Sequence, residues 1–364
     1  MIEIEKIARD ISANYELIDD DVRLQLEGCQ ISIRSNSNEF LKKLAFYFAH
    51  ALADNEDNDI HDIEIIAIER ESPELGLTFI DWKREPGKTG RKDSYIDLVD
   101  GRVIRKVRTG MIFLQSNNHL FAVGPCLEND NQVINFINAQ YMNLLQRKGA
   151  LICHASAIAR NEECFAIAAL SAGGKSTLML NILEEPHLTY VTNDRLLLKR
   201  VSDSIEAYGI PKLPRVNPGT IINNDRLRPM LSETRQKELM SLPKEDLWDL
   251  EEKYDVLLQD LYGSGKIISK AKLKTFLILN WQSESNKPCD IQRVNLSERK
   301  DLLQAIMKSP GPFYQYQDGS FFRDDTELDE KSYYELLKET AIYEASGKVN
   351  FDFATRYFLN HIIQ

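Results

Sequence analysis

Apolar and polar residues alternate along residues 1–148 in a way that predicts a small α/β domain. The runs VRLQL and QISIR flank a turn at 27–29 and are typical of a β-hairpin. Helical periodicity appears in 39–53 and returns in 129–149. Between these helices, short apolar runs predict further strands: DIEIIAIE, LTFIDW, YIDLV, RVIRKV and MIFLQ.

From residue 149 onward, the predicted elements follow a different order. The strand-like runs LICHASAIA and ECFAIAAL lead into a Gly-rich turn, a helix and another strand, LTYVT, which is typical of a nucleotide-binding α/β core. KTFLILNW predicts a buried central strand, and RKDLLQAIMK, SYYELLKETAIYEA and FATRYFLNHII predict helices. We therefore expect an α/β fold with the core at 149–330, after the 1–148 domain and before a helical segment at 331–364.

The composition narrows the cellular compartment and the classes of binding partner that we expect for this protein. The chain is 43% hydrophobic and 28% charged, and no run approaches the ~20 apolar residues that span a membrane. The acidic N-terminus lacks the order of a secretory signal, and five cysteines without a C-x-x-C pair fit a reducing compartment. A net charge of -11 disfavours nucleic-acid binding. We expect a cytoplasmic protein that binds neither membrane nor nucleic acid.

The Gly-rich turn, within the run ALSAGGKST, has the residues that a phosphate-binding loop needs. Glycines let backbone N–H groups converge on phosphate oxygens, Lys175 can reach the β and γ phosphates, and the Ser176 hydroxyl can bind Mg²⁺. The helix that follows adds its N-terminal dipole. The alternative is a Gly-rich turn with a solvated lysine. We predict that ATP is bound by Ser171, Ala172, Gly173, Gly174, Lys175, Ser176 and Thr177.

Three further side chains are candidates for phosphoryl-transfer chemistry. Asp194 follows the next strand, where a carboxylate can hold Mg²⁺ or accept the proton of a hydroxyl acceptor, although it can also be a simple turn residue. His154 lies on the strand before the loop, and a lone histidine there is more often packed or exposed on the surface. Arg215, in PRVNPG, can stabilise charge on the phosphoryl group, but an isolated arginine is usually solvated or paired.

Positive charge is concentrated in 83–108, which contains nine basic and four acidic residues, a local balance of +5. In an acidic chain this segment predicts a surface that docks an anion or an acidic partner. The alternative is a solvated hairpin face.

The second half resembles the HPr kinase/phosphorylase family, whose distant relatives are the phosphoenolpyruvate carboxykinases. The likeness lies in the order of the His154 strand, the loop SAGGKS, the strand ending in Asn193-Asp194, and PRVNPG. More closely, most of residues 80–313 is similar to the HPr-kinase-related kinase B family. The motifs shared with that family are KTGRKDSYIDL, IRKVRTGMIFLQ, NQVINFINAQYMN, TNDRLLL, YGIPKLPRVNPGTIINN, DLWDLEEKYDV, LILNW and MKSPGPF.

This resemblance implies a bacterial ATP- and Mg²⁺-dependent kinase whose acceptor is a hydroxyl, a serine of a protein partner. It assigns phosphate binding to Lys175, metal binding to Ser176 and Asp194, and catalysis to Asp194 with His154. Asn193 replaces the first of two adjacent acids in the family, and Ala169 and Ala172 replace glycines. A small-molecule kinase and a nucleotide-gated binding protein without turnover remain alternatives, and homo-oligomerisation is left open.

Overall fold

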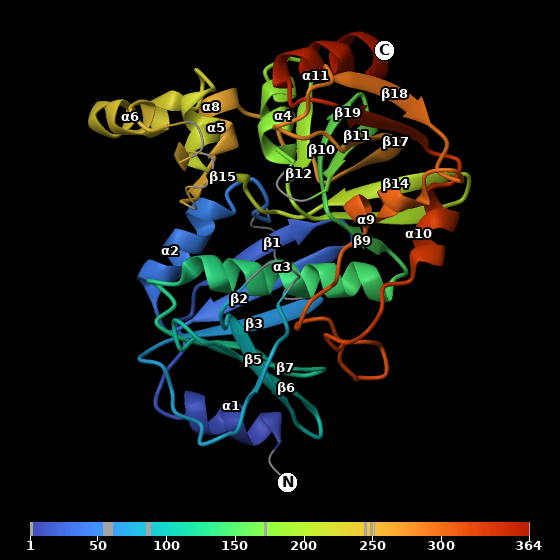
Figure 1. Cartoon of the computed structure of the whole chain (residues 1–364). Helices are drawn as coiled ribbons and strands as arrows, with labels where there is room; N and C mark the ends of the chain where they lie inside the picture. Colours follow the sequence, from blue (N-terminus) through green and yellow to red (C-terminus); the bar gives the residue numbers. More distant parts are fainter. Residues whose placement is uncertain are drawn as a thin grey trace. The chain divides into compact units, whose positions relative to one another are not determined.

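The computed structural model describes residues 3–53, 61–84, 89–170, 173–243, 246–247, 250 and 252–363. Within these ranges the chain has a mixed α/β structure with two large sheets, which confirms the predicted α/β class (Figure 1). The chain divides into two compact units. Unit 1 comprises Met1–Gly149 with Ser309–Glu327, and unit 2 comprises Ala150–Lys308 with Leu328–Gln364.

Unit 1 is built on an eight-stranded sheet of order β1-β2-β3-β8-β7-β6-β5-β4. The strands are β1 (Asp21–Leu26), β2 (Cys29–Ser35), β3 (Ile63–Glu69), β4 (Ile80–Asp81), β5 (Asp93–Asp97), β6 (Gly101–Lys106), β7 (Ile112–Ser116) and β8 (Leu120–Gly124). The predicted hairpin is confirmed, because β1 and β2 pair antiparallel. The helices of this unit are α1 (Ile4–Ser12), α2 (Asn38–Tyr47) and α3 (Asp130–Arg147). The last two confirm the predicted helices, and α2 ends earlier than expected.

The segment Ser309–Glu327 packs with unit 1, although the sequence analysis placed it at the end of the second domain. Buried side chains of unit 1 hold it by its backbone. Gln115 and Asn143 donate hydrogen bonds of 2.9 and 2.6 Å to the carbonyl of Phe313. Buried carbonyls need such partners, and the partners lie about 170 residues or more earlier in the chain. Local sequence therefore did not indicate this placement.

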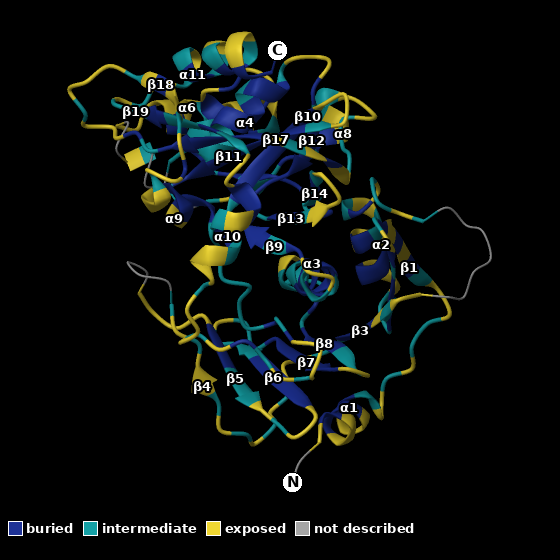
Figure 2. Cartoon of the chain, turned by 90° about the vertical axis from the view of Figure 1, so that its right-hand side faces the viewer, coloured by how far each residue is buried: buried dark blue, intermediate teal, exposed yellow. Residues whose placement is uncertain are grey.

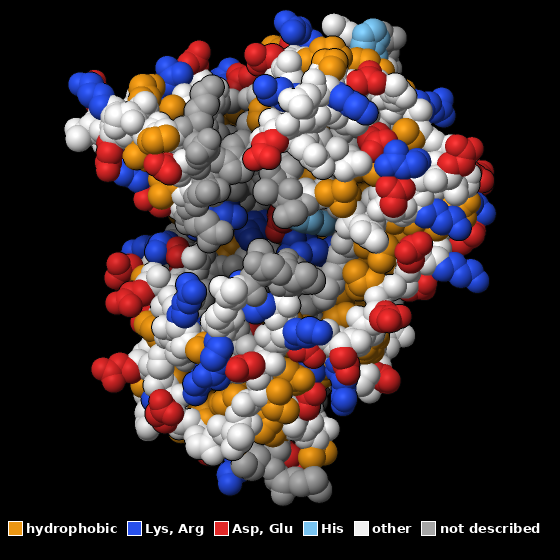
Figure 3. All heavy atoms as spheres, viewed as in Figure 1, with side chains coloured by type: hydrophobic (Ala, Val, Ile, Leu, Met, Phe, Trp, Pro, Cys, Tyr) orange, Lys and Arg blue, Asp and Glu red, His pale blue; other side chains and the backbone are white. Residues whose placement is uncertain are grey.

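The basic segment 83–108 is only partly a surface feature. Arg102 is fully buried and contacts Asp97 through two hydrogen bonds, and Lys106, whose side chain is only 13% exposed, lies 2.6 Å from Asp93. Lys88 lies outside the described residues. On the face drawn in Figure 3, acidic and basic side chains are interspersed. The docking surface remains a prediction, and these two side chains are already paired with Asp97 and Asp93.

Unit 2 is built on a nine-stranded sheet of order β12-β10-β11-β17-β14-β13-β9, with β19 beside β17 and β18 beside β19. The strands are β9 (Leu151–Cys153), β10 (Ala155–Arg160), β11 (Glu163–Ala169), β12 (Thr189–Thr192), β13 (Leu196–Val201), β14 (Ser204–Gly209), β17 (Lys270–Leu279), β18 (Asp290–Val294) and β19 (Ala341–Ser346). Most residues of β10, β11 and the last half of β17 are buried (Figure 2). The prediction of a buried central strand in KTFLILNW is thus confirmed.

Helices and a small hairpin complete unit 2. The helices are α4 (Lys175–Leu183), α5 (Pro218–Ile222), α6 (Glu233–Met240), α8 (Leu258–Tyr262), α9 (Leu303–Ile306), α10 (Glu330–Leu337) and α11 (Phe351–Tyr357); the hairpin pairs β15 (Arg215–Val216) with β16 (Tyr254–Asp255). The helix predicted for SYYELLKETAIYEA is wrong in its second half, where the chain forms β19. Pairing with β17 and β18 on its two sides outweighs the local helical preference there.

No helix within the described ranges is long and apolar enough to cross a membrane. All five cysteines are free, and four of them are buried.

Candidate functional site

The Gly-rich turn connects β11 to α4. Gly174 is the N-cap of α4 and has a φ of +78°, a left-handed conformation that glycine adopts without strain. A Cβ atom at this position would lie 2.5 Å from Cζ of Phe351, so a side chain here would strain the backbone and displace the Phe351 ring. Ser171 and Ala172, predicted to bind ATP, lie outside the described residues. The described part thus leads from a strand end into a helix N-terminus, where backbone N–H groups are available to an anion.

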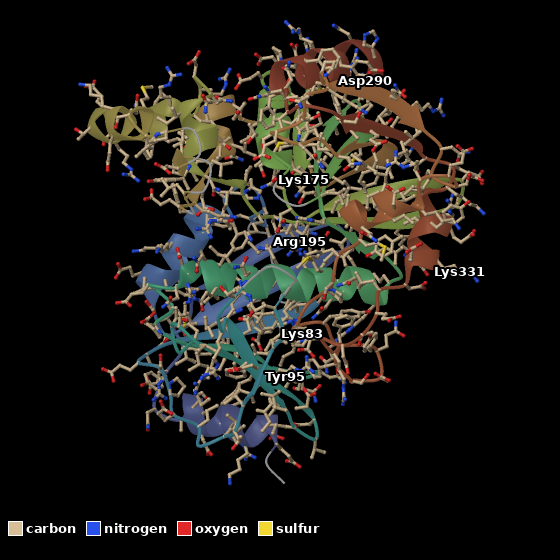
Figure 4. The ribbon with its side chains drawn as sticks, in the orientation of Figure 1. Lys83, Tyr95, Lys175, Arg195, Asp290 and Lys331 are labelled. Atoms are coloured by element: carbon tan, nitrogen blue, oxygen red, sulfur yellow. The ribbon has the colours of Figure 1, made fainter. Side chains whose placement is uncertain are left out.

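Three of the predicted side chains converge beside this turn. Nε2 of His154 lies 3.0 Å from Nζ of Lys175 and 3.1 Å from Oδ1 of Asp194. Lys175 comes from the first turn of α4, His154 from the junction of β9 and β10, and Asp194 from the turn after β12. Figure 4 shows Lys175 and its neighbour Arg195 in unit 2. The structure therefore places the Lys175 ammonium and the Asp194 carboxylate within hydrogen-bond distance of one histidine nitrogen.

The protonation states of this group follow from burial and charge. Burial lowers the pKa of His154, which favours a neutral ring, and burial lowers the pKa of Lys175 to about 8 despite the charge of Asp194. Burial disfavours ionisation of Asp194, but the charge of Arg195 and the hydrogen bond from His154 outweigh it and hold its pKa well below the usual value. At neutral pH the site combines an ionised carboxylate, a neutral imidazole and a lysine that is still mostly protonated.

The turn that bears Asp194 is tightly constrained. Asp194 has a φ of +73°, which is unusual for a residue with a side chain. Arg195 donates through Nη1 to the Asp194 carbonyl at 2.9 Å and to Oδ2 at 2.5 Å, and Thr192 Oγ1 donates to the Arg195 carbonyl at 2.6 Å. Strained backbone held by its surroundings is often found where a side chain must be aimed. These bonds aim one carboxylate oxygen at Arg195 and leave the other for His154.

Asn193 contacts the hydroxyl that was predicted to bind the metal. Its Oδ1 accepts hydrogen bonds from Ser156 at 2.6 Å and from Ser176 at 2.9 Å, and Asn193 is 7% exposed. The two oxygens of Asp194 instead face His154 and Arg195. Of the Asn193-Asp194 pair, the amide rather than the carboxylate therefore contacts Ser176.

These residues fit a magnesium ion that is held mainly by a nucleotide. Among the described residues, no cluster of three or more His, Cys, Asp or Glu side chains could hold a metal by itself. Mg²⁺ commonly takes one or two protein oxygens and fills its remaining positions with phosphate oxygens and water. Ser176 and Asn193 carry two such oxygens near the start of α4, where Mg²⁺ would replace the hydrogen bond that now joins them, and the nearby carboxylate of Asp194 adds negative charge.

Two other predicted residues have their contacts outside the His154–Asp194 group: Thr177, in the first turn of α4, and Arg215. Arg215 lies in β15, with Nε 3.2 Å from Oδ1 of Asp255 on the paired strand. Thr177 shares a 2.8 Å hydrogen bond with Thr220 of α5. Neither has a described contact with His154 or Asp194.

Sequence reasoning did not assign roles to Arg195 and Ser156. Arg195 directly follows Asp194 in the TNDRLLL motif, so its position was a usable signal. No sequence signal pointed to Ser156, because its contact with Asn193 depends on the pairing of β10 with β12.

Comparisons with known proteins identify no family. No family model and no curated protein matches the chain. Among solved structures, the chain is similar to the Hpr(Ser) kinase/phosphatase from Coxiella burnetii, with 10% identity and a TM-score of 0.29. The alignment covers 58% of this chain and 96% of that chain. A TM-score of this size does not establish a common fold, and function has to be inferred from the geometry of the site.

Proposed function

We propose that unit 2 is an ATP-dependent phosphotransferase that moves the γ-phosphoryl group of Mg-ATP to a hydroxyl acceptor. The observation that supports this most is the contact chain from Lys175 at the start of α4, through His154, to Asp194. It places a cation for the phosphates next to a carboxylate with a lowered pKa. Phosphoryl transfer depends mainly on this kind of positioning and charge stabilisation.

Each side chain has a role in the proposed step. The loop backbone and Lys175 hold the β and γ phosphates, and Ser176 with Asn193 would hold the Mg²⁺ that neutralises phosphate charge. Asp194 accepts the proton of the acceptor hydroxyl as its oxygen bonds to the γ-phosphorus, the bond to the β-phosphate oxygen breaks, and ADP leaves. His154 and Arg195 keep the carboxylate ionised and aimed, in keeping with their effect on its pKa.

The acceptor that we propose is a serine hydroxyl of a protein partner, as the resemblance to the HPr-kinase-related kinases implies. Replacement of the family acid by Asn193 favours a second candidate, a nucleotide-gated binding protein without turnover. The two differ in one observable, which is transfer of label from ATP.

The test combines calorimetry with label transfer. Lys175→Ala should weaken Mg-ATP binding about 10- to 100-fold, because charge-assisted hydrogen bonds to the phosphates are lost. Asp194→Asn should keep binding and lower transfer from γ-labelled ATP to proteins of a lysate by about 10²- to 10⁴-fold, the usual contribution of a general base. Lys274→Ala, a surface lysine paired with Glu163, is the control and should behave like the parent.

Equal Mg-ATP affinity in the parent and Lys175→Ala would contradict the loop assignment. Binding that depends on Lys175 without any labelled product would favour the non-catalytic candidate. Full transfer in Asp194→Asn would remove the carboxylate from its proposed role.

A further inference from the structure

Three parallel strands of unit 2 end at one edge of the sheet, where the Gly-rich turn begins. β11 and β17 pair in parallel up to Ala169 opposite Leu279, and β17 and β19 pair in parallel up to Leu279 opposite Ala345 (Figure 1). The carboxyl ends of parallel strands meet at the same edge. Just beyond these ends, the chain carries Gly173 after β11, Trp281 after β17 and Phe351 at the start of α11.

The two aromatic side chains contact the two glycines of the turn. Trp281 is 8% exposed, and its Nε1 donates a 3.0 Å hydrogen bond to the carbonyl of Gly173. The Phe351 ring lies edge-on to the Trp281 ring, with centroids 5.2 Å apart and an interplanar angle of 82°. The same ring fills the space in which a side chain on Gly174 would lie. We call this pair the aromatic clamp.

The hydrogen bond from Trp281 determines which way the Gly173–Gly174 peptide faces. In a planar trans peptide, the carbonyl and the following N–H point in opposite directions. With the Gly173 carbonyl held by the indole, the N–H of Gly174 points away from Trp281. Because both residues are glycines, the reversed orientation has little steric cost, and the loop would then present a carbonyl oxygen where it could present an N–H. The indole bond therefore stabilises one of two accessible orientations.

We propose that Trp281 and Phe351 are positioning residues that hold the Gly173–Gly174 peptide in the orientation that binds phosphate. The ends of β17 and β19 and the start of α11 thereby become part of the nucleotide site. This inference rests on the proposed nucleotide binding by the loop. The clamp contacts the backbone of the loop, and in this proposal it has no role in the phosphoryl-transfer step at Asp194.

The first test measures binding of the hydrolysis-resistant analogue Mg-AMP-PNP by calorimetry. Trp281→Phe keeps an apolar ring and removes the donor, and we expect about 3- to 10-fold weaker binding, the range of one hydrogen bond. Trp82→Phe, in unit 1, is the matched control and should bind like the parent. A parent that does not bind the analogue would overturn the proposed function and the clamp together. A parent that binds and a folded Trp281→Phe that binds equally well would overturn the clamp alone.

The second test needs no change at Trp281. The chain has three tryptophans, so Trp82→Phe and Trp248→Phe assign the ¹⁵N–¹H indole signal of Trp281 by elimination. We expect this signal to lie downfield, to exchange slowly with solvent and to shift when Mg-AMP-PNP is added, while that of Trp82 stays in place. If the indole N–H of Trp281 exchanges with solvent as fast as a free indole and its shift does not change on addition of the analogue, the proposed role of the clamp is wrong. This test holds even if Trp281→Phe does not fold.

Discussion

At the scale of single residues, the central feature is that one nitrogen faces two partners. Nε2 of a neutral His154 can donate a hydrogen bond to Asp194 or accept one from Lys175, but it cannot do both at once. Phosphates that attract Lys175 would leave this nitrogen to donate to Asp194. Arrival of the nucleotide would in this way complete the orientation of the carboxylate.

Nucleotide affinity should depend on pH through Lys175, whose pKa is lowered to about 8. Mg-ATP favours the protonated lysine, so its binding should take up a proton above pH 8, and affinity should fall as pH rises through that range. Calorimetry in two buffers of different ionisation enthalpy measures the uptake. In Lys175→Arg the side chain stays protonated and the dependence should largely disappear. An identical decline in that variant would assign the titration to another group, of which Lys212, also with a pKa of about 8, is the first to test.

Asn193→Asp should strengthen Mg²⁺ binding and favour the reverse reaction. The substitution places a carboxylate oxygen where the amide oxygen now accepts from Ser176, and carboxylates are stronger ligands for Mg²⁺. The parent, with one ionisable group at this pair, should act as a forward kinase with little phosphorolysis. Purified phospho-acceptor and inorganic phosphate provide the assay, with pyrophosphate as the product. Rapid pyrophosphate formation by the parent would contradict this expectation.

At the scale of elements, the site depends on how β11 passes into α4. The change of direction takes place at Gly174, where a left-handed backbone and the Phe351 ring both exclude a side chain. Gly174 is the left-handed N-cap of α4, so the helix begins at Lys175 and carries that residue and Ser176 in its first turn.

Gly174→Ala should therefore weaken both folding and nucleotide binding. The left-handed conformation alone costs about 1–2 kcal/mol for a residue with a Cβ atom. Gly263→Ala is a matched control, since Gly263 has a φ of +94° and no neighbour within 4 Å of an added Cβ. Chemical denaturation should show a clearly larger loss for Gly174→Ala than for Gly263→Ala. Equal losses, with nucleotide binding intact, would mean that Phe351 moves aside without consequence.

At the scale of the whole molecule, the chain enters unit 1 twice. The segment Ser309–Glu327 returns to it, and Arg102 holds the returning segment from the interior. Its Nη1 donates to the carbonyls of Pro312 and Phe322, each at 3.0 Å, and its guanidinium lies 4.6 Å from the centroid of the Phe321 ring.

Arg102→Met should destabilise unit 1 by at least about 2 kcal/mol, because two carbonyls lose their donor and a ring contact loses its cation. Arg91→Met removes an exposed pair with Asp81 and should cost about 0–1 kcal/mol. Urea denaturation of the full chain, monitored at amides of β6 by hydrogen exchange, distinguishes the two. A loss for Arg102→Met no greater than that for Arg91→Met would show that the segment is held by other contacts.

The sequence by itself determined the α/β class, the β1–β2 hairpin, α2, α3, the central strand β17 and the Gly-rich turn before α4. These features follow from apolar periodicity and turn residues, which act over a few neighbouring positions. It also singled out His154, Lys175 and Asp194, which the structure brings together, but their distances and shifted pKa values required the fold.

Only the tertiary structure decided the features that depend on distant partners. It made Ala341–Ser346 a strand, because β17 and β18 are there to pair with it. The fold also packs Ser309–Glu327 with unit 1. It brings Trp281 and Phe351 into contact with the Gly-rich turn. Backbone pairing and burial join residues far apart in the chain, and no local pattern records which distant segment will supply the missing donor or strand.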